Sequence, residues 1–179
     1  MLSVTRRGLR FLGSSVLAAA FAAVLTGCGG PRFNVTVSLS DEWVATGRVP
    51  SVEVDMVGAG AADTPALEGK DLREYFRAGD DLRAGSPRQT FTFSRSDVGP
   101  KTLSTSDGVW AAWDQRAAET LFILANWPRI DESLPGTSDP RRLMLPMDPA
   151  YWGTNEIEVV LFETGLRVMT IPQSTVPAQ

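Results

Sequence analysis

Histidine is absent from this chain, cysteine occurs once, as Cys28, and lysine occurs twice, as Lys70 and Lys101. Without histidine, the chain lacks the commonest general base and the commonest transition-metal ligand of proteins. A single thiol excludes an internal disulfide and any zinc site built from cysteine and histidine. Stability must therefore come from apolar burial, for which the chain offers five tryptophans and eight phenylalanines.

Sequence motifs that carry chemistry are also missing. The 179 residues contain no Gly-x-Ser-x-Gly nucleophile elbow, no phosphate-binding glycine loop with lysine, and no calcium-loop spacing. The acidic doublets Asp80-Asp81 and Asp131-Glu132 are the remaining candidates for carboxylate catalysis or weak calcium binding. Adjacent side chains in a loop point apart, so we interpret both doublets as solvated loop residues. We expect no catalysis, no cofactor and no metal.

Two other functions remain as alternatives. A carboxylate-dependent carbohydrate-active enzyme would need a cleft in which two carboxyl groups lie roughly 5–9.5 Å apart. A small-ligand-binding module would need an apolar cavity of roughly 300 Å³ or more. Each alternative therefore requires a feature that only a structure can display.

The first 27 residues have the form of an export signal. Arg6, Arg7 and Arg10 give a basic start, and residues 11–25 are apolar or small. A membrane-spanning helix needs about 20 consecutive apolar residues, and this run is shorter and includes small polar side chains. A core helix also fits poorly, because charge flanks the run on one side and glycine on the other. We therefore interpret residues 1–27 as a signal peptide.

The sequence Leu25-Thr26-Gly27-Cys28 closes this run and resembles the lipobox of bacterial lipoproteins, which is a leucine, two small residues and a cysteine. The resemblance implies that the thiol of Cys28 receives diacylglycerol, that the chain is cut before it, and that the new amine is acylated with a chain such as palmitate. Several acyl chains hold a protein on a membrane, whereas one binds reversibly. Residues 28–32 would then form a short tether. An ordinary cleaved signal peptide with a free Cys28 is the alternative.

Processing at this point would change the charge of the chain. It would remove three arginines and no acid, leaving 152 residues with 14 basic and 21 acidic side chains. An acidic domain does not suit nucleic acid or an anionic membrane surface. The lipoprotein resemblance implies a place in the bacterial cell envelope. Gly29, instead of the aspartate that retains some lipoproteins in the inner membrane, favours the outer membrane and a domain facing the periplasm.

The export route stays open. Residues 5–9 resemble a twin-arginine signal, but Arg10 stands where that pattern prefers an apolar residue. The general secretory route is the other possibility, and the choice between inner and outer membrane is likewise open.

Alternating apolar and polar residues predict a β-rich domain. The segment 120–126 is apolar on both faces and predicts a strand covered on two sides. Short helices are predicted at 70–79, capped by Asp71, at 106–119, and as one turn at 148–152. Strands are predicted at 33–39, 51–57, 89–94, 101–105, 120–126, 141–147, 155–163 and 165–171.

These elements predict a single domain over residues 33–171, followed by a loose tail at 172–179. Its fold class is mainly β, an antiparallel sandwich of the transthyretin or immunoglobulin kind with one or two short helical insertions. Many short strands without regular βαβ alternation favour this architecture over a parallel sheet.

Two residue groups are candidates for partner binding. Trp110 and Trp113 lie one helical turn apart, and they either pack in the core or form an exposed aromatic anchor. The second group is Asp139-Pro140-Arg141-Arg142, in which the proline fixes a turn and the aspartate can pair with an arginine two residues later. The group forms either an ion-paired clamp between loop and strand or a contact for an anion or partner.

The order of elements has a second resemblance. The chain has, in this order, the cysteine expected to be lipidated, the strand with VEVDMV, the helix with DLREYF, the strand with LFILANW, and a tryptophan before a final hairpin. This order is similar to that of the outer-membrane lipoprotein of the type VI secretion system. The resemblance implies a transthyretin-like sandwich that anchors a secretion complex by binding the periplasmic end of an inner-membrane protein. The Trp110 helix and the Asp139 turn have no counterpart that we can place in that family.

The sequence therefore predicts a membrane-anchored envelope lipoprotein. Its periplasm-facing domain is expected to bind another envelope protein without catalysis. An assembly anchor like that of the type VI secretion system is an alternative.

Overall fold

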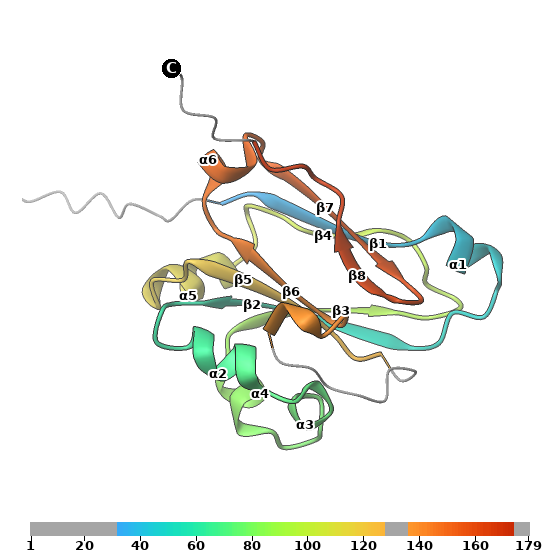
Figure 1. Ribbon diagram of the computed structural model, residues 1–179, viewed down its shortest axis with the longest axis horizontal. Helices are drawn as coiled ribbons and strands as arrows, with labels where there is room; N and C mark the ends of the chain where they lie inside the picture. The colour runs from blue at the N-terminus through green and yellow to red at the C-terminus, as the bar shows by residue number, and fades with distance from the viewer. Residues whose placement is uncertain (1–31, 128–135, 174–179) are drawn as a thin grey trace, which may run out of the picture.

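The computed structural model describes residues 32–127 and 136–173. The signal peptide, the lipobox with Cys28, the doublet Asp131-Glu132 and the last six residues lie outside this part of the chain. Within it, two four-stranded sheets pack face to face as a sandwich (Figure 1). The predicted mainly β sandwich is confirmed. None of the helices in the described part is long and apolar enough to cross a membrane.

The first sheet has the order β4-β1-β7-β8 and the second has the order β3-β2-β5-β6. The strands of the first sheet are β1 (Asn34–Leu39), β4 (Lys101–Leu103), β7 (Glu156–Phe162) and β8 (Gly165–Val168). The strands of the second are β2 (Val52–Ala59), β3 (Arg88–Phe93), β5 (Thr120–Ala125) and β6 (Arg142–Pro146). The edges of the two sheets meet where the backbone N–H of Leu166 in β8 donates to the carbonyl of Pro140 before β6, at 2.7 Å.

Strand direction departs from the prediction at one place. Strands β1 and β7 are parallel, with paired residues from Asn34↔Glu156 to Leu39↔Leu161. The other pairs are antiparallel, namely β1–β4, β2–β3, β2–β5, β5–β6 and β7–β8. The two strands are far apart in the chain, so no hairpin fixes their relative direction. Alternation fixes only which face of each strand is apolar. The fully antiparallel expectation is therefore corrected at this pair.

The parallel pair gives the sandwich two distinct ends. We call the end where β1 and β7 begin the first pole, and the end where both strands finish the second pole. At the second pole, β1 is followed by α1 (Asp41–Ala45) and β7 by its turn into β8. Helix α1 was not predicted. It is capped by Ser40, whose hydroxyl oxygen accepts a hydrogen bond from the backbone N–H of Trp43 at 3.3 Å.

The space between the sheets holds all five tryptophans. Trp43, Trp110, Trp113, Trp127 and Trp152 are each at most 4% exposed. The rings of Trp110 and Trp113 meet edge to face with their centroids 5.0 Å apart. Large aromatic side chains therefore supply the burial that a chain without disulfides needs.

The outer face of the second sheet is covered by the connection between β2 and β3 (Figure 1). Leu67, Leu72 and Tyr75 of this connection are buried against Phe122 and Leu124 of β5. The cover explains why β5 is apolar on both faces, and the prediction for this strand is confirmed. The connection contains α2 (Thr64–Gly69), α3 (Leu72–Tyr75) and α4 (Asp81–Gly85).

The sequence predicted one helix where the structure has three. Asp71 caps α3, since its carboxylate accepts from the backbone N–H groups of Arg73 and Glu74, as predicted. Asp80 caps α4 in a segment that was expected to be a loop. Gly79 separates the two helices with φ +82°, a conformation that glycine adopts without a steric cost.

The remaining short helices are α5 (Val109–Gln115), the 3₁₀ turn η1 (Gly136–Ser138) and α6 (Pro149–Trp152). Helix α6 is confirmed with Pro149 in its first turn, Asp148 as the cap and Gly153 in the left-handed conformation. Helix α5 is shorter than predicted and its N-cap, Gly108, makes no side-chain cap bond.

Close packing at Gly58 of β2 generates a test of the core. A Cβ added there would lie 2.5 Å from Cγ of Trp113. We expect Gly58→Ala to lower the free energy of unfolding by about 1–3 kcal/mol, because the indole and the backbone of β2 must move apart. The matched control is Gly69→Ala, where no atom lies within 4 Å of the new Cβ. Urea denaturation of both variants measures the difference, and equal stability would contradict the packing.

Candidate functional site

The two tryptophans proposed as partner anchors are core residues. Trp110 and Trp113 are both 0% exposed. Their ring nitrogens donate to the carbonyls of Ser104 at 2.8 Å and Pro87 at 2.9 Å, so the polar atom of each indole is satisfied inside the fold. The expectation of an exposed aromatic anchor at these positions does not hold, because helix α5 turns both rings into the space between the sheets. The alternative of core packing describes both residues.

The second predicted group is an internal clamp. Asp139, Arg141 and Arg142 are at most 2% exposed. The guanidinium of Arg141 donates to both carboxylate oxygens of Asp139, at 3.0 and 2.8 Å, which is the bidentate pair that the spacing suggested. This arrangement leaves neither guanidinium on the surface to meet a partner, so the surface-contact expectation is not met in this conformation.

Arg142 joins three parts of the chain. Its side chain donates to the carbonyl of Gly136 at 3.1 Å and also to the carbonyl of Lys70. Burial lowers the pKa of Arg142 below its ordinary value, although Asp139 acts in the opposite direction. The arginine thereby fastens β6 to η1 and to the end of α2. Sequence reasoning could not find this contact, because Lys70 and Arg142 are 72 positions apart.

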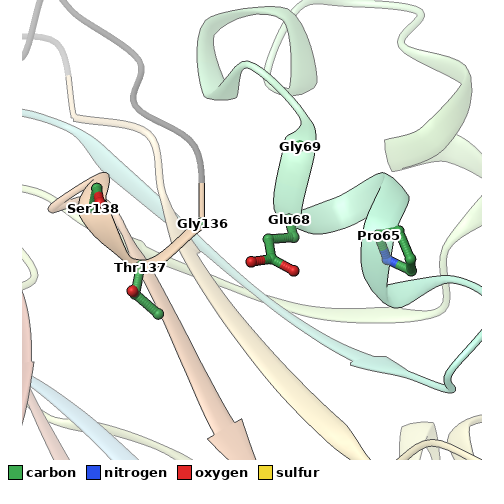
Figure 2. Close-up of a pocket in the computed structure, with 6 residues that line it drawn as sticks. All are labelled: Pro65, Glu68, Gly69, Gly136, Thr137 and Ser138. Carbon is green, nitrogen blue, oxygen red and sulfur yellow. The ribbon is translucent and has the colours of Figure 1, made fainter.

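The adjacent surface carries a depression of about 510 Å³ between α2 and η1. Figure 2 shows Glu68 extending from α2 toward Gly136 and Thr137. The lining residues are Pro65, Glu68, Gly69, Gly136, Thr137 and Ser138. They supply one carboxylate and no basic side chain, so this depression does not present the two carboxyl groups of a glycosidase. Among the described residues, no three metal-binding side chains gather into a possible metal site.

A buried carboxylate holds the helical cover on the second sheet. Asp55 of β2 is 0% exposed and accepts from Nε of Arg83 at 2.8 Å, the hydroxyl of Thr90 at 2.6 Å and the hydroxyl of Tyr75 at 3.2 Å. Burial, followed by the charge of Asp55, raises the pKa of Tyr75 well above its ordinary value of 10.0. The sequence placed Asp55 on the polar face of its strand but could not identify the three partners that cover it.

The outer face of the first sheet remains accessible. Four side chains on this face are half-buried, two from β1 (Thr36 and Ser38) and two from β7 (Val160 and Phe162). Glu158 of β7 is exposed. Three depressions of about 350, 270 and 370 Å³ follow one another along β1 and β7. The first two share Ser38 and Val160, and the last two share Ser40 and Phe162. We call this continuous depression the β1–β7 groove. It runs from the first pole to the second.

The β1–β7 groove is acidic. Its lining includes Arg167 as one basic side chain, and the guanidinium of Arg167 lies 5.0 Å above the ring of Phe162. The acidic residues of the lining are Asp41, Glu42, Glu156, Glu158 and Glu163. At the second pole, Trp43, Thr46 and the β7–β8 turn widen the groove to its 370 Å³ section. An acidic groove with the half-buried ring of Phe162 at one end can bind a basic polypeptide segment.

Three solved structures are similar to this chain. A chain in the structure named "Type VI membrane complex" is 12% identical, with 78% of this chain and 98% of that chain covered and a TM-score of 0.50. Lip of Serratia marcescens, a membrane-bound component of the type VI secretion system, gives 12% identity, 78% and 97% coverage and a TM-score of 0.49. The type VI secretion system lipoprotein TssJ1 from Pseudomonas aeruginosa is 13% identical, with 83% of this chain and 100% of that chain covered and a TM-score of 0.47.

These likenesses concern the fold. At 12% identity the first of them establishes that this chain is a β-sandwich of the same kind, and the match covers nearly the whole of the other chain. Neither a family model nor a curated protein sequence matches the chain. The resemblance inferred from element order therefore agrees with the observed architecture.

The Asp55 contacts generate a stability test. We expect Asp55→Asn to lower the free energy of unfolding by about 3–5 kcal/mol, because Arg83 would lose a buried carboxylate partner. Glu53→Gln is the control. Glu53 contacts the same arginine at 3.3 Å but its side chain is 39% exposed, so about 1 kcal/mol or less should be lost. Urea denaturation distinguishes the two, and equal losses would show that Asp55 does not fasten the cover.

Proposed function

We propose that this protein is a lipid-anchored protein of the bacterial cell envelope that assembles with another envelope protein, in the manner of the type VI secretion lipoproteins. One observation carries the proposal. A lipobox-like sequence ending at Cys28 directly precedes a β-sandwich whose fold matches a chain of a type VI membrane complex over 98% of that chain. An anchor followed at once by a domain of that fold supports both membrane attachment and assembly.

The short tether supports a fixed orientation on the membrane. Residues 29–31 separate the proposed anchor, Cys28, from Arg32, the first described residue, so that four residue steps join the two. At about 3.5 Å per residue, four residues span about 14 Å at most. Arg32 pairs with Asp114 of α5 at 2.8 Å and leads into β1, so the chain enters the domain at the first pole. The first pole would therefore face the membrane and the second pole would face away from it.

This orientation identifies the surface that a partner would meet. A protein that spans the periplasm from the opposite membrane reaches the second pole first. That pole carries α1, the β7–β8 turn and the 370 Å³ section of the β1–β7 groove, with Glu42 and Glu163 in its lining. Because the groove is acidic, the matching segment of the partner would be basic, and its association would weaken as salt concentration rises.

The anchor is tested by intact mass. We expect membrane-extracted protein to lack residues 1–27 and to carry diacylglycerol with a further acyl chain on Cys28. Cys28→Ser should lack the diacylglycerol, because serine does not supply the thiol that the lipobox resemblance implies is acylated. A wild-type protein that keeps residues 1–27, or that is cut but has a free thiol, would contradict the proposal.

The partner surface is tested by a charge reversal. We expect Glu42→Lys to weaken co-purification of the envelope partner by at least about fivefold, because a like charge would oppose the basic segment. The control is Glu68→Lys, which makes the same charge change on exposed α2 beside the depression in Figure 2. Loss of the partner with Glu68→Lys alone would instead place it on the helical cover. Circular dichroism checks that both variants are folded.

A further inference from the structure

Exposed apolar side chains are few in the described residues and they gather toward one end. The large hydrophobic side chains with substantial exposure are Tyr151 at 39%, Met169 at 50% and Ile171 at 85%. Each lies outside the strands, with Tyr151 on α6 and the other two after β8. The described part of this acidic domain has no other large hydrophobic side chain with such exposure. Exposed apolar side chains that gather in one place mark an interaction surface.

Backbone hydrogen bonds place these residues at the first pole. The N–H of Asn34, at the start of β1, donates to the carbonyl of Asn155 at 2.8 Å, so α6 and the start of β7 lie beside the start of β1. The segment after β8 returns to the same end, because the N–H of Met169 donates to Glu158 and that of Gln173 to Tyr151, at 2.8 and 2.9 Å. Figure 1 shows α6 next to the beginning of β1.

We infer that this apolar patch, formed by Tyr151, Met169 and Ile171, rests on the lipid surface to which the protein is anchored. The inference depends on the proposed acylation of Cys28. The tether allows Arg32 to lie at most about 14 Å from the anchored cysteine, so it keeps the first pole, where the patch lies, on the side of the domain that faces the lipid.

The chemistry of the patch suits the membrane interface. Tyr151 has an apolar ring and a polar hydroxyl, which is the combination found at the level of lipid headgroups. Its ring is braced edge to face by the buried ring of Trp152, with 4.9 Å between the centroids. Ile171 adds an aliphatic side chain that is almost wholly exposed. The patch therefore has the amphipathic character of an interfacial contact.

Neighbouring charges define the kind of lipid. Glu156 and Glu158 lie at the start of β7 beside the patch and are exposed, while Arg32 is paired with Asp114. Carboxylates at the contact would be repelled by anionic headgroups and tolerated by zwitterionic ones. The occupant is therefore a zwitterionic phospholipid surface, and contact should diminish as the anionic fraction of the bilayer increases.

The test uses the full lipidated protein in phosphatidylcholine and phosphatidylethanolamine vesicles. Acylation consumes the thiol of Cys28, so an introduced cysteine is the single site for a fluorescent label. Ile171→Cys reports on the patch, and Thr164→Cys in the exposed β7–β8 turn is the matched control at the second pole. Each label is exposed to a nitroxide quencher carried on lipid headgroups. We expect quenching at position 171 to be at least about threefold stronger than at 164.

A second experiment tests the patch with a label at position 173, so that Ile171 itself can be kept or substituted. Gln173→Cys, also exposed beside Tyr151, is labelled in the otherwise unchanged protein and in one that also carries Met169→Ser and Ile171→Asp. Both altered side chains are at least half exposed, so the melting temperature should not change. Lipid quenching at position 173 should fall with the double substitution, because the patch no longer rests on the lipid. It should stay above the quenching at position 164, because the tether still keeps the first pole near the anchor.

Each outcome decides the inference. Equal quenching at 171 and 164 in acylated protein would overturn the lipid contact and leave the anchor intact. Self-quenching of the 171 label that increases with protein density, without lipid quenching, would assign the patch to a second copy of the chain and overturn it too. Protein whose intact mass lacks acyl chains would overturn the proposed anchor, and the inference with it.

Discussion

The parallel pairing of β1 with β7 is the constraint on which the rest of this molecule depends. Six residues of β1 lie in register with six of β7, so the first strand of the domain occupies the middle of its sheet. The pairing determines that both strands begin at one pole and end at the other. It therefore brings the entry of the chain, α6 and the returning segment after β8 together, and it places α1 and the β7–β8 turn at the opposite end.

The two sheets use their outer faces differently. The second sheet is covered by three short helices that must be held in place, and Asp55 does this with three hydrogen-bond donors from the β2–β3 connection and β3. The clamp at Arg142 secures the other side of the cover. Buried charges of this kind are costly unless they are fully paired, so they fix one arrangement of the cover. The first sheet has an accessible groove, which is the surface that we propose for a partner.

The proposed anchor and the geometry of the fold together imply one orientation of the domain on the membrane. With the proposed anchor at Cys28, so short a tether would leave the domain little freedom to rotate away from a membrane. An apolar first pole on the lipid and an acidic second pole facing the periplasm would let the domain present its groove in a fixed direction. Restricting orientation in this way lowers the entropy lost when a partner binds.

The sequence by itself determined the elements whose evidence is local. Alternation located most strands, and the two-sided apolar segment identified β5 as covered. The cap Asp71 and the helical turn at 148–152 were visible in their own short segments. Local spacing also gave the Asp139–Arg141 pair, since its members are two residues apart. The lipobox-like sequence gave the expectation for Cys28, which lies outside the described residues.

Tertiary structure alone decided what depends on distant neighbours. A period of two tells which face of a strand is apolar but not which strand lies beside it or in which direction, so the parallel β1–β7 pair was missed. Tryptophans at helical spacing suit a core or a surface equally, and only the position of α5 settled that they are buried. The partners of Asp55 and Arg142 come from other elements, because burial of charge is satisfied through space rather than along the chain.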